Sequence, residues 1–91
     1  MPVQWTVSAG RDRENAINYI AKDSLTAALS QLDAIEGQTD RLADDPTLGR
    51  PGRVKGTREL VVNRSPFMVV YRIKGERVQI LRVLHGAQQW P

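Results

Sequence analysis

The sequence contains no cysteine, one histidine and few aromatic side chains (5%). Without cysteine the chain forms neither a disulfide nor a thiolate site, and a reducing compartment is its natural setting. One histidine and no thiol make a structural zinc site implausible, so no metal or cofactor is expected. No apolar run approaches the roughly 18 residues of a membrane span, and the N-terminus lacks the apolar core of a signal peptide. We therefore expect a small cytoplasmic domain without membrane contact.

The length of 91 residues supplies one hydrophobic core, so we expect a single domain over residues 1–91. Charge is divided unevenly along it, although the net charge is only +3. Residues 1–45 carry four basic and eight acidic side chains, whereas residues 46–91 carry nine basic and two acidic ones. Such asymmetry indicates a basic surface for a nucleic acid or an acidic protein segment, although a merely solvated surface is the alternative.

The first half has the pattern of a strand followed by two helices. Residues 3–7 alternate between apolar and polar, and Ser8 is placed to cap a helix that runs to about Lys22. Asp23 or Ser24 caps the second helix. The apolar stripe of this helix is Leu25, Ala28, Leu29, Leu32, Ile35, Thr39 and Leu42. The short break between the helices predicts an antiparallel helical hairpin.

The second half has the pattern of a loop and three strands. Residues 44–56 hold two prolines and three glycines and predict a loop. Strands are expected at 57–62, 67–73 and 77–85, with a tight turn at 74–76. The predicted fold is α+β, in the order β-α-α-β-β-β, with the helical hairpin packed on one face of a small, mainly antiparallel sheet.

This arrangement predicts that the other face of the sheet is open. Met68, Val70 and Arg72 alternate with the core side of their strand and are expected on that face. Tyr71 is expected in the core with its hydroxyl at the rim. Arg82 interrupts an otherwise apolar strand face, which predicts either a bulge or a pairing with a carboxylate such as Glu59. The functional reading of Arg82 is a cation held ready for a phosphate or a partner carboxylate.

Four segments of the chain are distinctive in their order and spacing: LGRPGR, GTREL, VVYRI and ILRVLHGAQ. Together they resemble the RelE/ParE superfamily of bacterial type II toxins, and the resemblance covers nearly the whole chain. It implies a toxin that stops growth or maintains plasmids and is silenced by an antitoxin encoded beside it. The antitoxin's C-terminal segment is expected to fold onto the toxin, and operator DNA is expected to be reached only through the antitoxin.

The superfamily divides into two chemistries, and the chain ending bears on the choice between them. RelE-like members cleave mRNA in the ribosome, whereas ParE-like members inhibit DNA gyrase. At positions where RelE-like nucleases carry phosphate-binding arginines, this chain has Met68 and Gln88. The ending VLHGAQQW is closer to ParE-like sequences. The resemblance therefore favours a ParE-like gyrase inhibitor, with a RelE-like mRNA interferase or a non-toxic regulatory member as alternatives.

A nuclease of another design requires an acid or base and cations around the phosphate. The candidate catalytic residues for it are His85, Arg82, Arg58 and Arg64, with Glu59 as a conceivable partner of the histidine. The competing interpretation is that His85 helps to end its strand.

A surface that binds a protein partner, unlike a nuclease site, requires no acid–base pair at these positions. The candidate partner-binding residues are Arg50, Arg53, Lys55, Arg72 and Trp90. Arginine and tryptophan commonly anchor interfaces, although Trp90 has a second interpretation, in which it folds back onto the sheet and caps the core.

Overall fold

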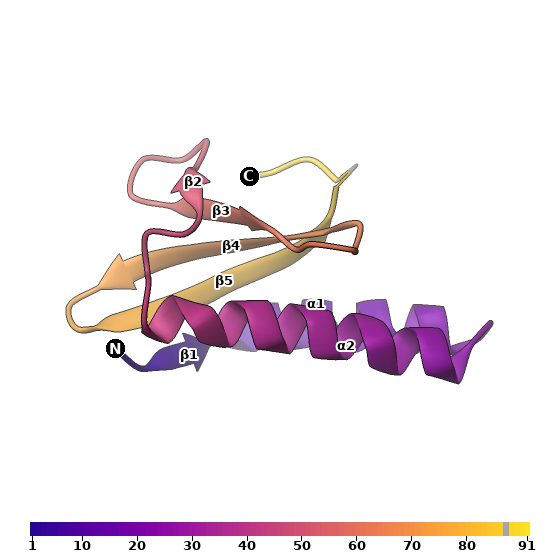
Figure 1. The fold of residues 1–91 in the computed structure, drawn as a ribbon. Coiled ribbons are helices and arrows are strands. Elements are labelled where there is room, and N and C mark those ends of the chain that lie inside the picture. Colours follow the sequence, from indigo (N-terminus) through magenta and orange to yellow (C-terminus); the bar gives the residue numbers. More distant parts are fainter. Residues whose placement is uncertain (87) are drawn as a thin grey trace.

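The computed structural model describes residues 1–86 and 88–91. In chain order the elements are β1 (Val3–Trp5), α1 (Val7–Ala21), α2 (Leu25–Asp40), the 3-10 turn η1 (Arg41–Ala43), β2 (Arg50–Pro51), β3 (Arg58–Val61), β4 (Phe67–Lys74) and β5 (Arg77–His85). The two helices lie side by side on one face of the sheet (Figure 1). The predicted α+β fold is confirmed, with one addition: the short strand β2 lies within the predicted loop.

The sheet has the strand order β1-β5-β4-β3-β2. The pairs β5·β4, β4·β3 and β3·β2 are antiparallel, whereas β1 runs parallel to β5. The parallel pair arises because the helical hairpin carries the chain across the sheet between β1 and the later strands. β1 pairs only with residues 78–80 of β5, so the rest of β5 extends beyond it.

Side-chain caps set where both helices begin. The prediction that Ser8 caps α1 is wrong: Thr6 is the cap, and its Oγ1 accepts a hydrogen bond from Ala9 N at 3.2 Å. The same hydroxyl donates to the Ile80 carbonyl oxygen at 2.8 Å, so the contact with β5 selects the earlier residue. Ser24 caps α2 as predicted, accepting from Ala27 N at 3.1 Å. Neither helix, within the part of the chain described, is long and apolar enough to cross a membrane.

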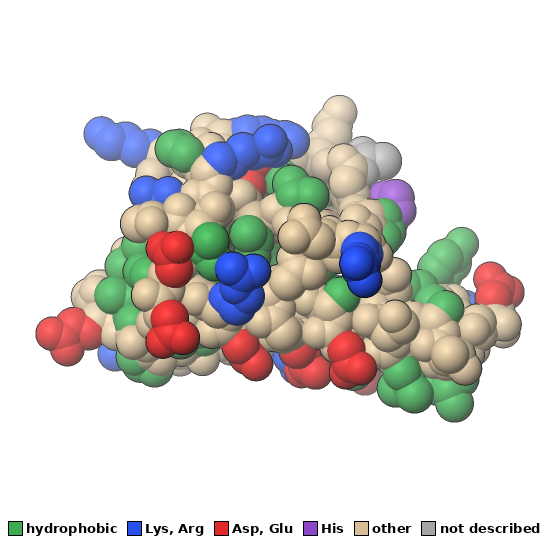
Figure 2. Space-filling model, viewed as in Figure 1, with side chains coloured by type: hydrophobic (Ala, Val, Ile, Leu, Met, Phe, Trp, Pro, Cys, Tyr) green, Lys and Arg blue, Asp and Glu red, His purple; other side chains and the backbone are tan. Residues whose placement is uncertain are grey.

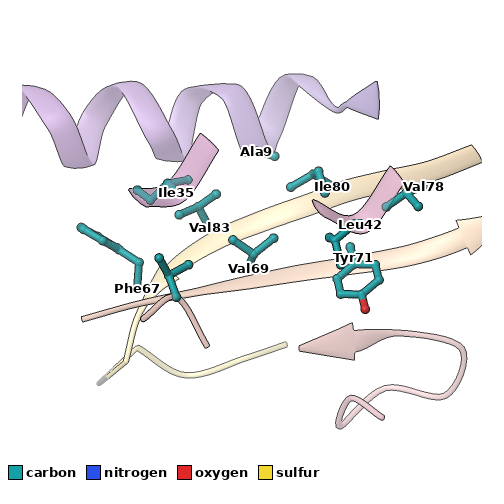
Figure 3. Packing of buried hydrophobic residues seen from close by; sticks show 10 residues of the cluster. Ala9, Ile35, Leu42, Phe67, Val69, Tyr71, Val78, Ile80 and Val83 are labelled. Carbon is teal, nitrogen blue, oxygen red and sulfur yellow. The ribbon is translucent and has the colours of Figure 1, made fainter. Parts of the chain in front are cut away.

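The main core lies between the helices and the sheet (Figure 3). Its buried members are Ala9, Ile35, Leu42, Val62, Phe67, Val69, Tyr71, Val78, Ile80 and Val83. The predicted stripe of α2 is confirmed at its C-terminal end but wrong for Leu25 and Leu29, which are 65% and 52% exposed. The hairpin tip that carries them reaches past the end of the sheet, where no strand is available to cover it (Figure 1).

The prediction of an open second sheet face is wrong for Met68 and Val70. Both are buried, and with Leu84 they form a second small apolar cluster against which Leu81 and Trp90 pack. The cover comes from the C-terminal tail, whose path the strand pattern does not specify. Arg72 is half-buried on β4 beyond this cluster.

The strand β5 contains a bulge next to Arg82. Val70 is paired with Arg82 but the next residue, Tyr71, is paired with Ile80, so one residue of β5 is left over. A bulge shifts the alternation of side chains along a strand. This shift places Ile80 and Val83 in the main core and Leu84 in the second cluster. The predicted bulge is confirmed.

Candidate functional site

A buried carboxylate organises the basic end of the sheet. Glu59 of β3 is only 3% exposed. Its Oε1 lies 3.2 Å from Arg50 Nη2, and its Oε2 accepts from the Arg53 backbone N–H at 3.1 Å and lies 3.7 Å from Arg53 Nε. A buried carboxylate is costly unless it is paired and hydrogen-bonded, so Glu59 holds the β2 loop against β3. Glu59, one of the carboxylates considered as a partner for Arg82, pairs with these loop groups, whereas Arg82 pairs with another carboxylate, Asp12.

The C-terminal tail closes over the same end of the sheet. Arg53 Nη1 donates to the Trp90 carbonyl oxygen at 3.2 Å, and the Trp90 side chain packs on the cluster of Met68, Val70 and Leu84. The indole Nε1 is buried and has no acceptor among the described residues. Of the two interpretations of Trp90, the structure takes the one in which the ring folds back onto the sheet.

The predicted partner-binding residues are therefore brought together only in part. Arg50, Arg53 and Trp90 meet around Glu59 and the tail. Lys55 is exposed in the following loop. Arg72 donates through Nε to Gln79 Oε1 at 2.8 Å, across the β4–β5 pair. In Figure 2 several basic side chains gather over the β2 end, while acidic side chains are spread along the helical layer.

A tyrosine fixes the loop from which Arg50 projects. Tyr71 is fully buried; its hydroxyl donates to the Pro46 carbonyl oxygen at 2.7 Å and accepts from Gly49 N–H at 2.8 Å. Burial, the largest effect, raises the pKa of this hydroxyl above its ordinary value. Tyr71 thus belongs to the core as predicted, but its hydroxyl is enclosed by the loop and does not lie at the rim.

The four candidate nuclease residues do not form one cluster. Arg58 and His85 lie at different positions along β4, since Arg58 is opposite Tyr71 and His85 is opposite Phe67, four residues away. Arg58 Nη1 donates to the Gly49 carbonyl oxygen at 2.7 Å. Arg64 lies in the β3–β4 turn with a positive φ of 62°.

Arg82, the fourth candidate, is held by a carboxylate of α1. Its Nε and Nη2 donate to Asp12 at 2.7 and 3.2 Å. This hydrogen bonding raises the pKa of Arg82. The expectation of a carboxylate partner is confirmed, but the partner is Asp12. The bulge changes the direction of the Arg82 side chain, and Arg82 lies on the part of β5 that extends beyond β1, where it meets α1. Among the described residues, no group of three potential metal ligands occurs.

The structure contains a groove that sequence reasoning did not identify. It has a volume of about 380 Å³ and lies between α1 and the ends of β4 and β5. Its lining residues are Asp12, Asn15, Ala16, Tyr19, Ile20, Pro66, Phe67, Val83, His85 and Gln88. Ala16 and Ile20 are four residues apart on α1 and so share one face of that helix, but only the tertiary packing places this face beside the end of β5.

Comparisons with known proteins agree with one another. The family model described as "ParE toxin of type II toxin-antitoxin system, parDE" matches residues 3–90. The chain is 44% identical over 89 residues to a protein of Sinorhizobium fredii named "Putative toxin Y4kP", covering 98% of this chain and 92% of that protein.

Solved structures of the same kind share the fold. A chain from the chromosomal ParDE TA system of P. aeruginosa superposes with a TM-score of 0.83 and 32% identity, covering 93% of this chain and 95% of that one. A chain of the toxin-antitoxin complex RelBE2 from Mycobacterium tuberculosis superposes with a TM-score of 0.59 and 28% identity, covering 92% and 95%.

Proposed function

This chain belongs to the ParE toxin family of type II toxin–antitoxin systems, and from that premise we propose that it arrests bacterial growth by inhibiting DNA gyrase in the cytoplasm when it is free of antitoxin. Its partner in the silent state is an antitoxin encoded beside it. The acidic side chains of that antitoxin meet the exposed guanidinium groups of Arg50 and Arg53, whose side chains are 62% and 51% exposed.

The observation that carries this proposal is the dispersal of the candidate nuclease residues. General acid–base cleavage of RNA needs a proton-transfer group and cations that converge on one phosphate. Here Arg82 is engaged by Asp12 and Arg58 by a loop carbonyl, on different parts of the sheet. Met68, where a RelE-like nuclease carries an arginine, is buried beneath the tail. Inhibition by surface binding requires no such convergence.

The test is expression without antitoxin, followed by parallel assays on the purified protein. We expect growth arrest, loss of gyrase supercoiling, and DNA-damage signalling while translation continues. His85→Gln keeps a polar side chain of similar size at the end of β5 and should be as toxic as the wild type, with Gln89→Ala on the exposed tail that follows β5 as a control. Ribosome-dependent mRNA cuts that disappear in His85→Gln would identify a nuclease instead, and harmless expression would identify a regulatory member.

A further inference from the structure

The turn between β3 and β4 holds an arginine in a backbone conformation that favours glycine. Arg64 has a φ of 62°, in the left-handed region that residues with a Cβ rarely adopt. In the turn between β4 and β5 the same region, with a φ of 61°, is occupied by Gly75. The two turns therefore place nearly the same demand on one residue's φ, and at position 64 a residue other than glycine meets it with backbone strain.

Two glutamines of α2 hold this turn in place. Gln38 makes two hydrogen bonds with Asn63, donating to its carbonyl oxygen at 3.1 Å and accepting from its N–H at 2.8 Å. Gln31 donates through Nε2 to the Arg64 carbonyl oxygen at 3.3 Å. The Oε1 atom of Gln31 is buried and has no donor among the described residues, which adds a second unfavourable feature at the same turn. Strain that the surrounding structure fixes in this way is typical of functional segments.

The side chain that this turn carries is available to a partner. Arg64 is exposed, and within the described chain no hydrogen bond or ion pair engages its guanidinium group. It is the one charged residue in the segment 60–71. Two exposed apolar residues lie close to it in the sequence, Val61, which is 54% exposed, and Pro66. The turn thus presents an isolated cation among apolar and uncharged polar residues.

This setting fits a carboxylate of a protein better than the phosphates of a nucleic acid. Binding to a nucleic-acid backbone depends on several cations that neutralise successive phosphates. A single arginine near apolar side chains is typical of the anchor of a protein–protein interface, where it forms a two-bond pair with a carboxylate. The turn is also separate from Arg50 and Arg53, because β2 pairs with the start of β3 whereas the turn follows the end of β3.

We propose that Arg64 is an anchor through which the toxin binds an acidic site on DNA gyrase, and that the strained turn directs its guanidinium group toward that site. This inference rests on the proposed function, because gyrase is the partner. A turn that is fixed before binding leaves less of the loop to be ordered in the complex.

Replacing Arg64 with glycine separates the effect of the side chain from that of the backbone. Arg64→Gly relieves the strain and removes the guanidinium group, so the variant should unfold at a temperature about 4–8 °C higher and yet bind gyrase more weakly by a factor of about ten or more. Arg64→Lys keeps the charge without the two-bond geometry and should bind with intermediate affinity. Lys74→Ala removes an exposed cation next to Gly75 in the other turn and is the matched control, with an affinity within about twofold of the wild type.

Binding is measured by biolayer interferometry with the gyrase holoenzyme of the same organism in the absence of DNA, alongside inhibition of supercoiling. Calorimetry with the protein encoded by the neighbouring reading frame should give the same affinity for the wild type and Arg64→Gly. A labelled DNA duplex, followed by fluorescence anisotropy, tests the alternative partner.

Three results would each overturn the proposal and leave the toxin function standing. They are equal gyrase affinity of Arg64→Gly and the wild type, a lower unfolding temperature of Arg64→Gly, and a loss of affinity confined to the DNA duplex. Failure of the wild-type protein to bind and inhibit gyrase would overturn the proposed function as well.

Discussion

Asp12 on α1 and Arg82 on β5, 70 residues apart in the sequence, form a two-bond ion pair with N–O distances of 2.7 and 3.2 Å. The same carboxylate accepts the Val83 N–H, so one side chain joins the first helix to the last strand at two points. Because Asp12 is largely buried while Arg82 is partly exposed, the pair contributes through hydrogen bonds more than through long-range attraction.

Asp12→Ala should therefore reduce the free energy of unfolding by about 1–2 kcal/mol, since it leaves both Arg82 and the Val83 N–H without their acceptor. Urea denaturation measures this loss. Glu14→Ala, an exposed acidic residue on the same helix, should change stability by less than about 0.5 kcal/mol. A double-mutant cycle with Arg82→Ala isolates the pair, and a coupling energy of zero would contradict its structural role.

Tyr71→Phe should lower the unfolding free energy by about 1–3 kcal/mol, because it leaves the buried Gly49 N–H and the Pro46 carbonyl without a partner. The loop that carries Arg50 should exchange its amide hydrogens faster. Tyr19→Phe is the matched control, since that ring is 72% exposed and its loss of a hydroxyl should be neutral. Equal stability of the two variants would show that the loop is held by other contacts.

The same hydroxyl makes stability depend on alkaline pH. The folded state raises the pKa of Tyr71 above the ordinary 10.0. In the unfolded chain the proton leaves first, so the contribution is complete below about pH 10 and is lost as pH rises through the folded pKa. Unfolding midpoints measured from about pH 9 to 11 should fall more steeply for the wild type than for Tyr71→Phe. An equal pH dependence of the unfolding midpoint in the two proteins would contradict a raised pKa of Tyr71 in the folded state.

Two glycines offer substitutions with opposite expected effects. Gly37 lies inside α2 with no neighbouring atom within 4 Å of an added Cβ, so Gly37→Ala should stabilise the protein by about 0.5–1 kcal/mol. At Gly49 an added Cβ would lie 2.7 Å from both Tyr71 Cε1 and its hydroxyl oxygen, so Gly49→Ala should destabilise it by about 1–3 kcal/mol. Thermal unfolding of both variants checks the signs.

Periodic elements were the most predictable part of the molecule. The bounds of β5, the turn at residues 74–76 and the Ser24 cap follow from alternation and local capping chemistry, which act between near neighbours. The Ser8 cap failed because a contact 74 residues away, from Thr6 to Ile80, competes with the local preference. The partner of Arg82 escaped prediction for the same reason: Asp12 lies on α1, 70 residues away, and no local pattern links it to Arg82.

The sequence by itself determined the order of helices and strands, the separation of acidic and basic halves and the resemblance to a toxin superfamily, because each depends on residue type and spacing along the chain. Only the tertiary structure decided that Trp90 closes the second sheet face, that Asp12 holds Arg82, and that the edge of β5 lies beside a groove. These features depend on which distant segments come into contact. Burial of apolar surface and pairing of charges select those contacts once the local helices and strands have formed.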